Sequence, residues 1–186
     1  MKKGITLGLV LCLCMVMLAG CGKQEQEDKN PLAVYKNGKE VVFVGMTLEE
    51  AEKILGEGKK IEYNDNSYRT FDSYEYESLN LNVKKDKADS KLKVSSLEIT
   101  GNKYTDFRGA TVGMPVNNLN NYYSDKEIKM SLQFARLNTK EPSPCRIFLS
   151  EDKKIIDPQE KEIGPHLIQF EPSGTEEDII NRIRIG

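Results

Sequence analysis

The sequence predicts an α+β fold in which two tandem helix-plus-antiparallel-strand repeats share one sheet, with the helices on one face. The stretch VVFVGMTLEEAEKIL at 41–55 aligns with GATVGMPVNNLNNYY at 109–123, and Val-Gly-Met is identical in both. Each copy is followed by short stretches in which apolar and polar residues alternate, which is typical of antiparallel strands with one buried face. A repeat of this length decides the architecture of a chain, so the two copies are taken as its structural units.

Each copy of the repeat begins with a predicted helix. Apolar residues recur at the spacing i, i+3, i+6, i+7, which forms one stripe on a helix. Because a helix of two or three turns is unstable alone in water, we expect both stripes to lie on the sheet. The stripes are Leu48, Ala51, Ile54 and Leu55 in the first copy, and Val116, Leu119, Tyr122 and Tyr123 in the second.

The signals that begin and end a helix are strong in the first copy only. Thr47 and Glu50 have the spacing of a capping box, and Gly56 suits the left-handed residue that follows a helix. The second copy has Pro115 in place of the capping threonine and Ser124 in place of the glycine. We therefore expect the second helix to be shorter and weaker.

In each copy the helix is followed by a strand and then a hairpin, and a further hairpin precedes the first copy. The segment 32–43 is a hairpin, because Asn37-Gly38 suits a type I′ turn. Two further hairpins are predicted, and Leu81 and Val83 of the first are matched with Ile168 and Phe170 of the second. The expected strands are 59–63, 79–83 and 94–99 in the first copy, and 126–130, 166–170 and 180–185 in the second.

Domain boundaries follow from the repeat. The first unit is expected at 32–105 and the second at 106–186, with an insertion at about 131–165 in the second. Four prolines interrupt the insertion, and CRIFL at 145–149 reads as an additional strand within it.

The first 21 residues predict an exported lipoprotein. Lys2 and Lys3 precede an uncharged stretch, 5–19, whose length suits a signal peptide better than a membrane span. The sequence Leu-Ala-Gly-Cys at 18–21 is similar to the bacterial lipobox, which implies cleavage after residue 20 and a lipid on Cys21. The alternatives are a plain secretory peptide and an uncleaved anchor. Two or more acyl chains hold a protein stably to a membrane.

The composition of the mature chain, residues 21–186, indicates which classes of partner it can bind. Residues 21–31 carry the lipidated cysteine and a polar, charged stretch, and are expected to be a flexible linker. Without Lys2 and Lys3 the 27 basic side chains become 25 against 29 acidic ones, so the net charge is −4. This mild acidity argues against nucleic acid as a partner. Because of the export signal and the lipid on Cys21, the protein is expected on the extracytoplasmic face of the cell membrane.

Residues with catalytic or metal-binding chemistry are sparse. There is no glycine-rich phosphate loop, no CxxC and no HExxH motif, so neither a cofactor nor a metal is expected. His166, the single histidine, is expected at a strand edge, and Cys145 is expected to be a small buried hydrophobe. The acidic clusters lack the spacing of a calcium loop. A pair of carboxylates that catalyses glycoside hydrolysis is left as an alternative, because the sequence neither selects nor excludes one.

The opening of the first copy resembles a known fold family. Val-Gly-Met-Thr followed by Glu-Ala-Glu-Lys-Ile-Leu-Gly, within 44–56, is similar to the opening of the beta-lactamase-inhibitor-protein-like fold. Related openings occur in small outer-membrane assembly lipoproteins of the SmpA/OmlA type. The resemblance implies tandem helix-plus-sheet modules that bind proteins, and it names no catalytic residue. Pro115 and the insertion depart from the pattern, and leave the partner open.

One surface is predicted to bind a protein partner. If 74–83 is one continuous strand, Leu79, Leu81 and Val83 face the helices, and Tyr74, Tyr76, Asn80 and Asn82 lie on the open face of the sheet. Tyrosine and asparagine are suited to protein recognition. The alternative is a bulge near Glu77-Ser78 that would turn both tyrosines into the core.

The sequence therefore favours a membrane-anchored, non-catalytic protein-binding module that uses its sheet face. The partner would be an envelope component or a secreted protein. The alternative is a cell-envelope hydrolase with an unrecognised active site, which should have a deep pocket with convergent polar groups.

Overall fold

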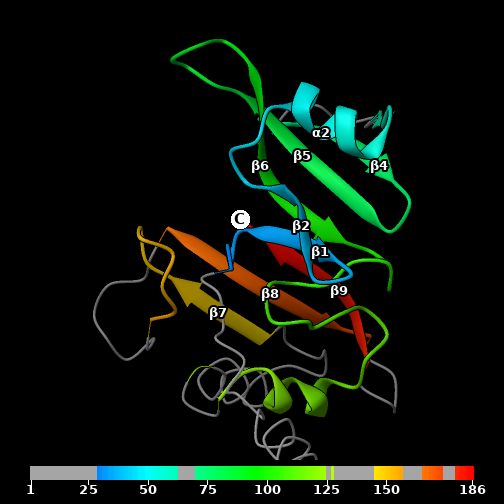
Figure 1. The fold of residues 1–186 in the computed structure, drawn as a ribbon, viewed down its shortest axis with the longest axis vertical. Coiled ribbons are helices and arrows are strands. Elements are labelled where there is room, and N and C mark those ends of the chain that lie inside the picture. Colours follow the sequence, from blue (N-terminus) through cyan, green and yellow to red (C-terminus); the bar gives the residue numbers. More distant parts are fainter. Residues whose placement is uncertain (1–28, 63–69, 125–126, 128–144, 157–164, 174–178) are drawn as a thin grey trace, which may run out of the picture.

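The computed structural model describes residues 29–62, 70–124, 127, 145–156, 165–173 and 179–186. Within these residues the chain is an α+β protein with antiparallel strands, as expected, and it has two sheets and two short helices (Figure 1). The larger sheet has seven strands in the order β3-β4-β5-β6-β9-β8-β7. In chain order the elements are β1 (Ala33–Lys36), β2 (Lys39–Phe43), α2 (Leu48–Leu55), β3 (Lys59–Ile61), β4 (Asp72–Tyr76), β5 (Leu79–Lys85), β6 (Leu92–Ile99), η1 (Val116–Asn121), β7 (Cys145–Leu149), β8 (His166–Pro172) and β9 (Ile180–Ile185).

The hairpin β1–β2 and the helix α2 cover one face of the large sheet (Figure 1). Asn37 and Gly38 both have positive φ, 53° and 75°, so the predicted type I′ geometry is confirmed. Apolar side chains from β4 through to β7 of the large sheet join the hairpin and α2 in one core cluster. Cys145, 2% exposed, belongs to this cluster, and the expectation that it is a buried hydrophobe is confirmed. His166 is the first residue of β8, opposite Leu149 on β7.

Helix α2 begins with the predicted capping box. The Thr47 side chain accepts a hydrogen bond from the Glu50 backbone N–H, and the Glu50 carboxylate accepts one from the Thr47 backbone N–H. Leu48 and Ala51 are buried, but Ile54 is 54% exposed, so its assignment to the buried stripe is wrong. At 3.6 residues per turn, Ile54 lies at the edge of the stripe, where this eight-residue helix no longer meets the sheet.

Replacing Thr47 with alanine is expected to destabilise the protein by about 1 kcal/mol, because the Glu50 N–H loses its acceptor. Thr47→Ser keeps the hydroxyl and should be nearly neutral. Urea unfolding followed by circular dichroism measures both, and equal losses in the two variants would contradict the capping role.

The second helix is weaker than the first, as expected. It is a 3₁₀ helix, and Pro115 provides no side-chain hydrogen bond at its beginning. Its predicted stripe is only partly buried, because Leu119 and Tyr123 are about 1% exposed whereas Tyr122 is 37% exposed. The strand expected at 126–130 lies outside the described residues apart from Glu127, as does most of the insertion at 131–165.

The two Val-Gly-Met segments make the same backbone contacts. Gly45 donates to the carbonyl of Val94, whose own N–H donates to Met46, both at 2.8 Å. Gly113 donates to the carbonyl of Ile180 at 2.8 Å, and the Ile180 N–H donates to Met114 at 2.9 Å. Both glycines have φ in the region that favours glycine, 100° and 88°. Each segment is therefore held on the last strand of its own half.

The strand pairing corrects one expected correspondence. If Leu97 and Ile99 on β6 are matched with Ile183 and Ile185 on β9, Leu79 rather than Leu81 occupies the position of Ile168. The reason is that Leu79 pairs with Ile99 as Ile168 pairs with Ile185. Alternation has a period of two, so the sequence pattern cannot distinguish registers that differ by two residues. The segment CRIFL is confirmed as a strand, β7, at the end of the large sheet.

Candidate functional site: the open face of the sheet

A row of polar side chains crosses the face of the sheet opposite the core. Its members are cross-strand partners in six successive pairings, so they share one face. From β3 to β7 the row, called here the open-face row, is Lys59, Glu75, Asn80, Glu98, Arg184, Gln169 and Arg146.

No helix of the described residues is long and apolar enough to span a membrane.

Glu98 lies at the centre of this face and holds its neighbours in place. Its Oε2 accepts a hydrogen bond from the Asn80 amide at 3.1 Å, and its Oε1 accepts one from Arg184 Nε at 3.0 Å. Arg182 Nε lies 3.2 Å from the same Oε1. Arg184 also forms an ion pair with Glu171 at 3.3 Å. These contacts within the sheet hold the guanidinium groups of Arg182 and Arg184 beside Glu98.

A second polar row lies beside the first. The Ser73 hydroxyl donates to the Asn82 side-chain oxygen at 2.7 Å, and the Asn82 amide donates to the Ser96 hydroxyl at 2.9 Å. Ser73 is only 1% exposed, so the orientation of Asn82 is set from within the sheet. Asn80 and Asn82 therefore lie on the open face, as the sequence predicted.

Several side chains of the open-face row, on both sides of Glu98, are accessible to solvent. The side chain of Glu75 is 55% exposed and that of Arg184 is 49% exposed. Arg146 is exposed and donates from Nε to Gln169 at 3.1 Å. Arginine recognises carboxylates, and side-chain amides donate and accept hydrogen bonds, so this face is equipped for polar protein recognition.

The placement of Tyr74 and Tyr76 on the open face is wrong. Residues 74–83 are two strands, β4 and β5, joined by a turn at Glu77 and Ser78, where Ser78 has φ 65°. In this hairpin Tyr76 pairs with Leu79 and Tyr74 with Leu81, so each tyrosine shares the core face with its leucine. Both rings are partly buried against the core. The alternative, a bulge near Glu77-Ser78, correctly predicted that both tyrosines turn toward the core. The structure has a hairpin turn at this point in place of the bulge.

Tyr76→Phe is expected to leave the stability within about 0.5 kcal/mol or to raise it slightly, because the buried Tyr76 hydroxyl has no hydrogen-bond partner among the described residues. Burial, with a smaller contribution from Glu52, raises the pKa of Tyr76 to about 12. Tyr76→Ala should instead cost about 2–4 kcal/mol, because the ring packs against Gly58. Thermal unfolding compares the two variants, and a neutral Tyr76→Ala would place the ring back in solvent.

Sequence reasoning missed the arginines of the second half. Arg146, Arg182 and Arg184 occupy the polar positions of CRIFL and INRIRI, two strands whose apolar residues were used to define the core. Their alternation with buried isoleucines was the available signal. It could not show that β9 lies beside β6, which is what brings Arg184 to Glu98.

A buried carboxylate lies apart from the open face and is structural. Asp106 Oδ1 accepts hydrogen bonds from the backbone N–H groups of Arg108, Gly109 and Ala110 at 2.8–2.9 Å, and Oδ2 accepts one from the Tyr123 hydroxyl. Burial raises the pKa of Asp106, and these four hydrogen bonds oppose the rise. Because both oxygens are engaged by this loop and by Tyr123, Asp106 is poorly placed to act on a substrate.

Comparisons with known proteins found no match for this chain. No family model matches the sequence, no curated protein matches it, and no solved structure matches the fold. Within the described residues no three His, Cys, Asp or Glu side chains are grouped as metal ligands. The features of this chain that bear on function are the open face of the sheet and the sequence of the first 21 residues.

Proposed function

We propose that this protein is a lipid-anchored, extracytoplasmic binding module that holds another protein on the open face of its sheet. The observation that carries the proposal is the open-face row, in which charged and amide side chains cross all seven strands and the central ones are held by hydrogen bonds. With strands about 4.8 Å apart, the row spans roughly 29 Å, the width of a typical protein–protein interface.

The rigidity of this surface supports recognition. Asn80, Asn82 and Arg184 are already held by hydrogen bonds to neighbouring strands. A side chain that is ordered before binding loses less conformational entropy when a partner arrives. Exposed arginines beside amides also offer directional contacts to carboxylates and backbone groups of a partner.

We further propose that the module consists of two tandem repeats that share the large sheet, as the resemblance to the beta-lactamase-inhibitor-protein-like fold implies. Three observations support this. Both Val-Gly-Met segments make equivalent backbone contacts. Both β6 and β9 carry one extra residue at the matching position, Ser95 and Asn181. The pairing of β6 with β9 is symmetric about Glu98 and Arg184.

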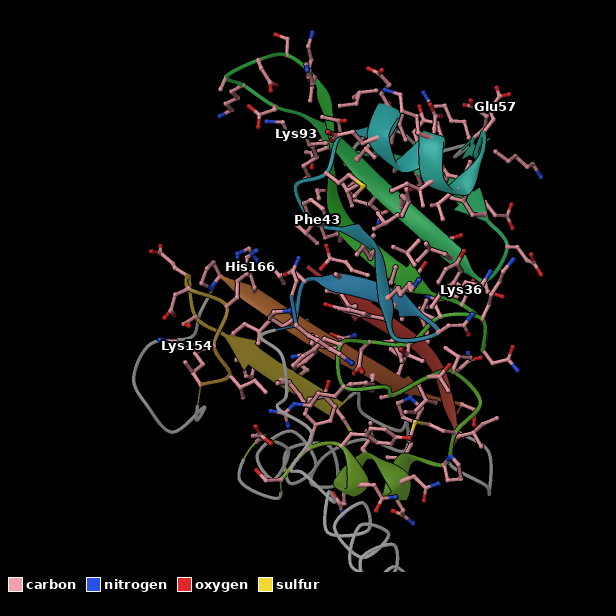
Figure 2. All side chains as sticks on the ribbon, viewed as in Figure 1. Lys36, Phe43, Glu57, Lys93, Lys154 and His166 are labelled. Carbon is pink, nitrogen blue, oxygen red and sulfur yellow. The ribbon has the colours of Figure 1, made fainter. Side chains whose placement is uncertain are left out.

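Capture from intact envelopes tests the binding function. A photo-reactive residue at Asn80 should cross-link a protein, and Arg184→Ala should reduce the yield, because Asn80 and Arg184 lie on the same face and meet at Glu98. Glu57→Ala, an exposed change beside α2 and away from this face, is the matched control (Figure 2). A yield that falls equally in both variants, or no adduct at all, would count against the open face as the binding surface.

Cys21→Ser is expected to abolish lipid attachment and release the protein from the membrane fraction, because the thiol that receives the lipid is gone. Incorporation of labelled palmitate and fractionation of envelopes measure this. Cys145→Ser is the control and should stay anchored, since Cys145 is buried in the core. A Cys21→Ser protein that keeps its label would refute the lipid-attachment site.

A further inference from the structure

We propose that the open face binds a second copy of this chain, packed face to face about a two-fold axis that runs parallel to the strands between β6 and β9. The inference deepens the proposed function and rests on it, because it names the partner of the same surface. It is carried by the distribution of charge along the open-face row.

The two halves of the row have opposite charge at matching positions. Strands β6 and β9 are neighbours, and the row can be counted outward from the boundary between them. At the first and third positions from the boundary, the β6 side has a glutamate and the β9 side has an arginine. At the second position both sides have an amide. The three matched pairs are Glu98 with Arg184, Asn80 with Gln169, and Glu75 with Arg146. Lys59 on β3 has no counterpart, because β7 ends the sheet on the other side.

This inversion makes the face complementary to itself. A two-fold axis parallel to the strands at the β6–β9 boundary places each position of the row over the matched position of the second copy. Glu98 then faces Arg184 of the partner subunit, and Glu75 faces Arg146 of the partner subunit. Packed sheets are about 10 Å apart, a gap that two facing long side chains can fill.

The same charges disfavour the other face-to-face dimer. A two-fold axis running along the row would place every side chain over its own copy, so that Glu98 would oppose Glu98 and Arg184 would oppose Arg184. Like charges in that arrangement repel each other. The row therefore selects one of the two symmetric arrangements.

Glu75 and Arg146 are the informative pair. They lie five strand spacings apart, roughly 24 Å, so they cannot reach each other within one chain. Glu98 and Arg184 are already in contact within the chain, so their substitution would also disturb the monomer. Any coupling between Glu75 and Arg146 must therefore act between two copies.

Charge reversal at these two positions tests the proposal. The full-length protein in detergent micelles is examined by sedimentation equilibrium over a concentration series at low and high salt. Glu75→Arg and Arg146→Glu should each weaken self-association by roughly ten-fold at low salt, because symmetry turns two attractive contacts into repulsive ones. The double variant Glu75→Arg/Arg146→Glu should return to within about three-fold of the unmodified protein. Glu57→Arg, which has the same charge change away from this face, should have no effect.

The outcomes separate this inference from the proposed function. Recovery in the double variant supports the second copy as the partner. A protein that is monomeric throughout the series, or a double variant as weak as either single one, overturns the inference. If the photo-reactive residue at Asn80 then still captures a different protein, the binding function stands with another partner, whereas no adduct would remove both.

Discussion

Phe170→Ala is expected to cause the largest loss of stability, about 3–5 kcal/mol. Phe170 lies on β8, is 1% exposed, and packs edge-to-face on Tyr123 with ring centroids 5.7 Å apart. Removing the ring leaves a cavity between the sheet and the segment that follows η1, which the surrounding strands can fill only partly. Urea unfolding followed by far-UV circular dichroism is the suitable measurement, since the chain has no tryptophan.

Gln169→Ala is the matched control for this prediction. Gln169 precedes Phe170 on the same strand but points to the open face, where it contacts Arg146 and Glu171. Its truncation should change the unfolding free energy by no more than about 0.5 kcal/mol. Comparable losses in the two variants would mean that the assignment of faces on β8 is wrong.

Asp106→Ala is expected to destabilise the protein by about 3 kcal/mol, because three backbone N–H groups, which are buried or partly buried, and the Tyr123 hydroxyl lose their acceptor. Arg108, whose guanidinium lies 4.8 Å from the centre of the Tyr123 ring and pairs with Glu127 at 2.9 Å, would lose part of its support. Urea unfolding measures the loss of stability, and hydrogen exchange of the Gly109 and Ala110 amides measures the loss of their hydrogen-bond acceptor.

Asp106→Asn distinguishes hydrogen bonding from charge. The amide oxygen can still accept from the backbone, and the Tyr123 hydroxyl can accept from the amide nitrogen. The loss should therefore be less than half of that in Asp106→Ala. An Asp106→Asn loss as large as that of Asp106→Ala would show that the negative charge, rather than the acceptor geometry, holds this loop.

Local signals in the sequence predicted the elements whose cause is local. The capping box of Thr47 and Glu50 and the turn at Asn37-Gly38 depend on residues within a few positions of each other, and both are present. The burial of Cys145 and the strand that contains it follow from composition and alternation, which are also readable along the chain. For the same reason Asn80 and Asn82 were placed on the correct face from their alternation with Leu79 and Leu81.

The sequence by itself therefore determined the α+β class, the hairpins β1–β2, β5–β6 and β8–β9, the cap of α2 and the signal that predicts the lipid on Cys21. Only the tertiary structure decided which strands are neighbours and how they pair. The two-residue turn at Glu77-Ser78 reversed the face of Tyr74 and Tyr76, and the pairing of β6 with β9 brought Arg184 to Glu98. The physical reason is that alternation records which residues share a face within one strand, whereas register and strand order depend on packing between segments far apart in the chain.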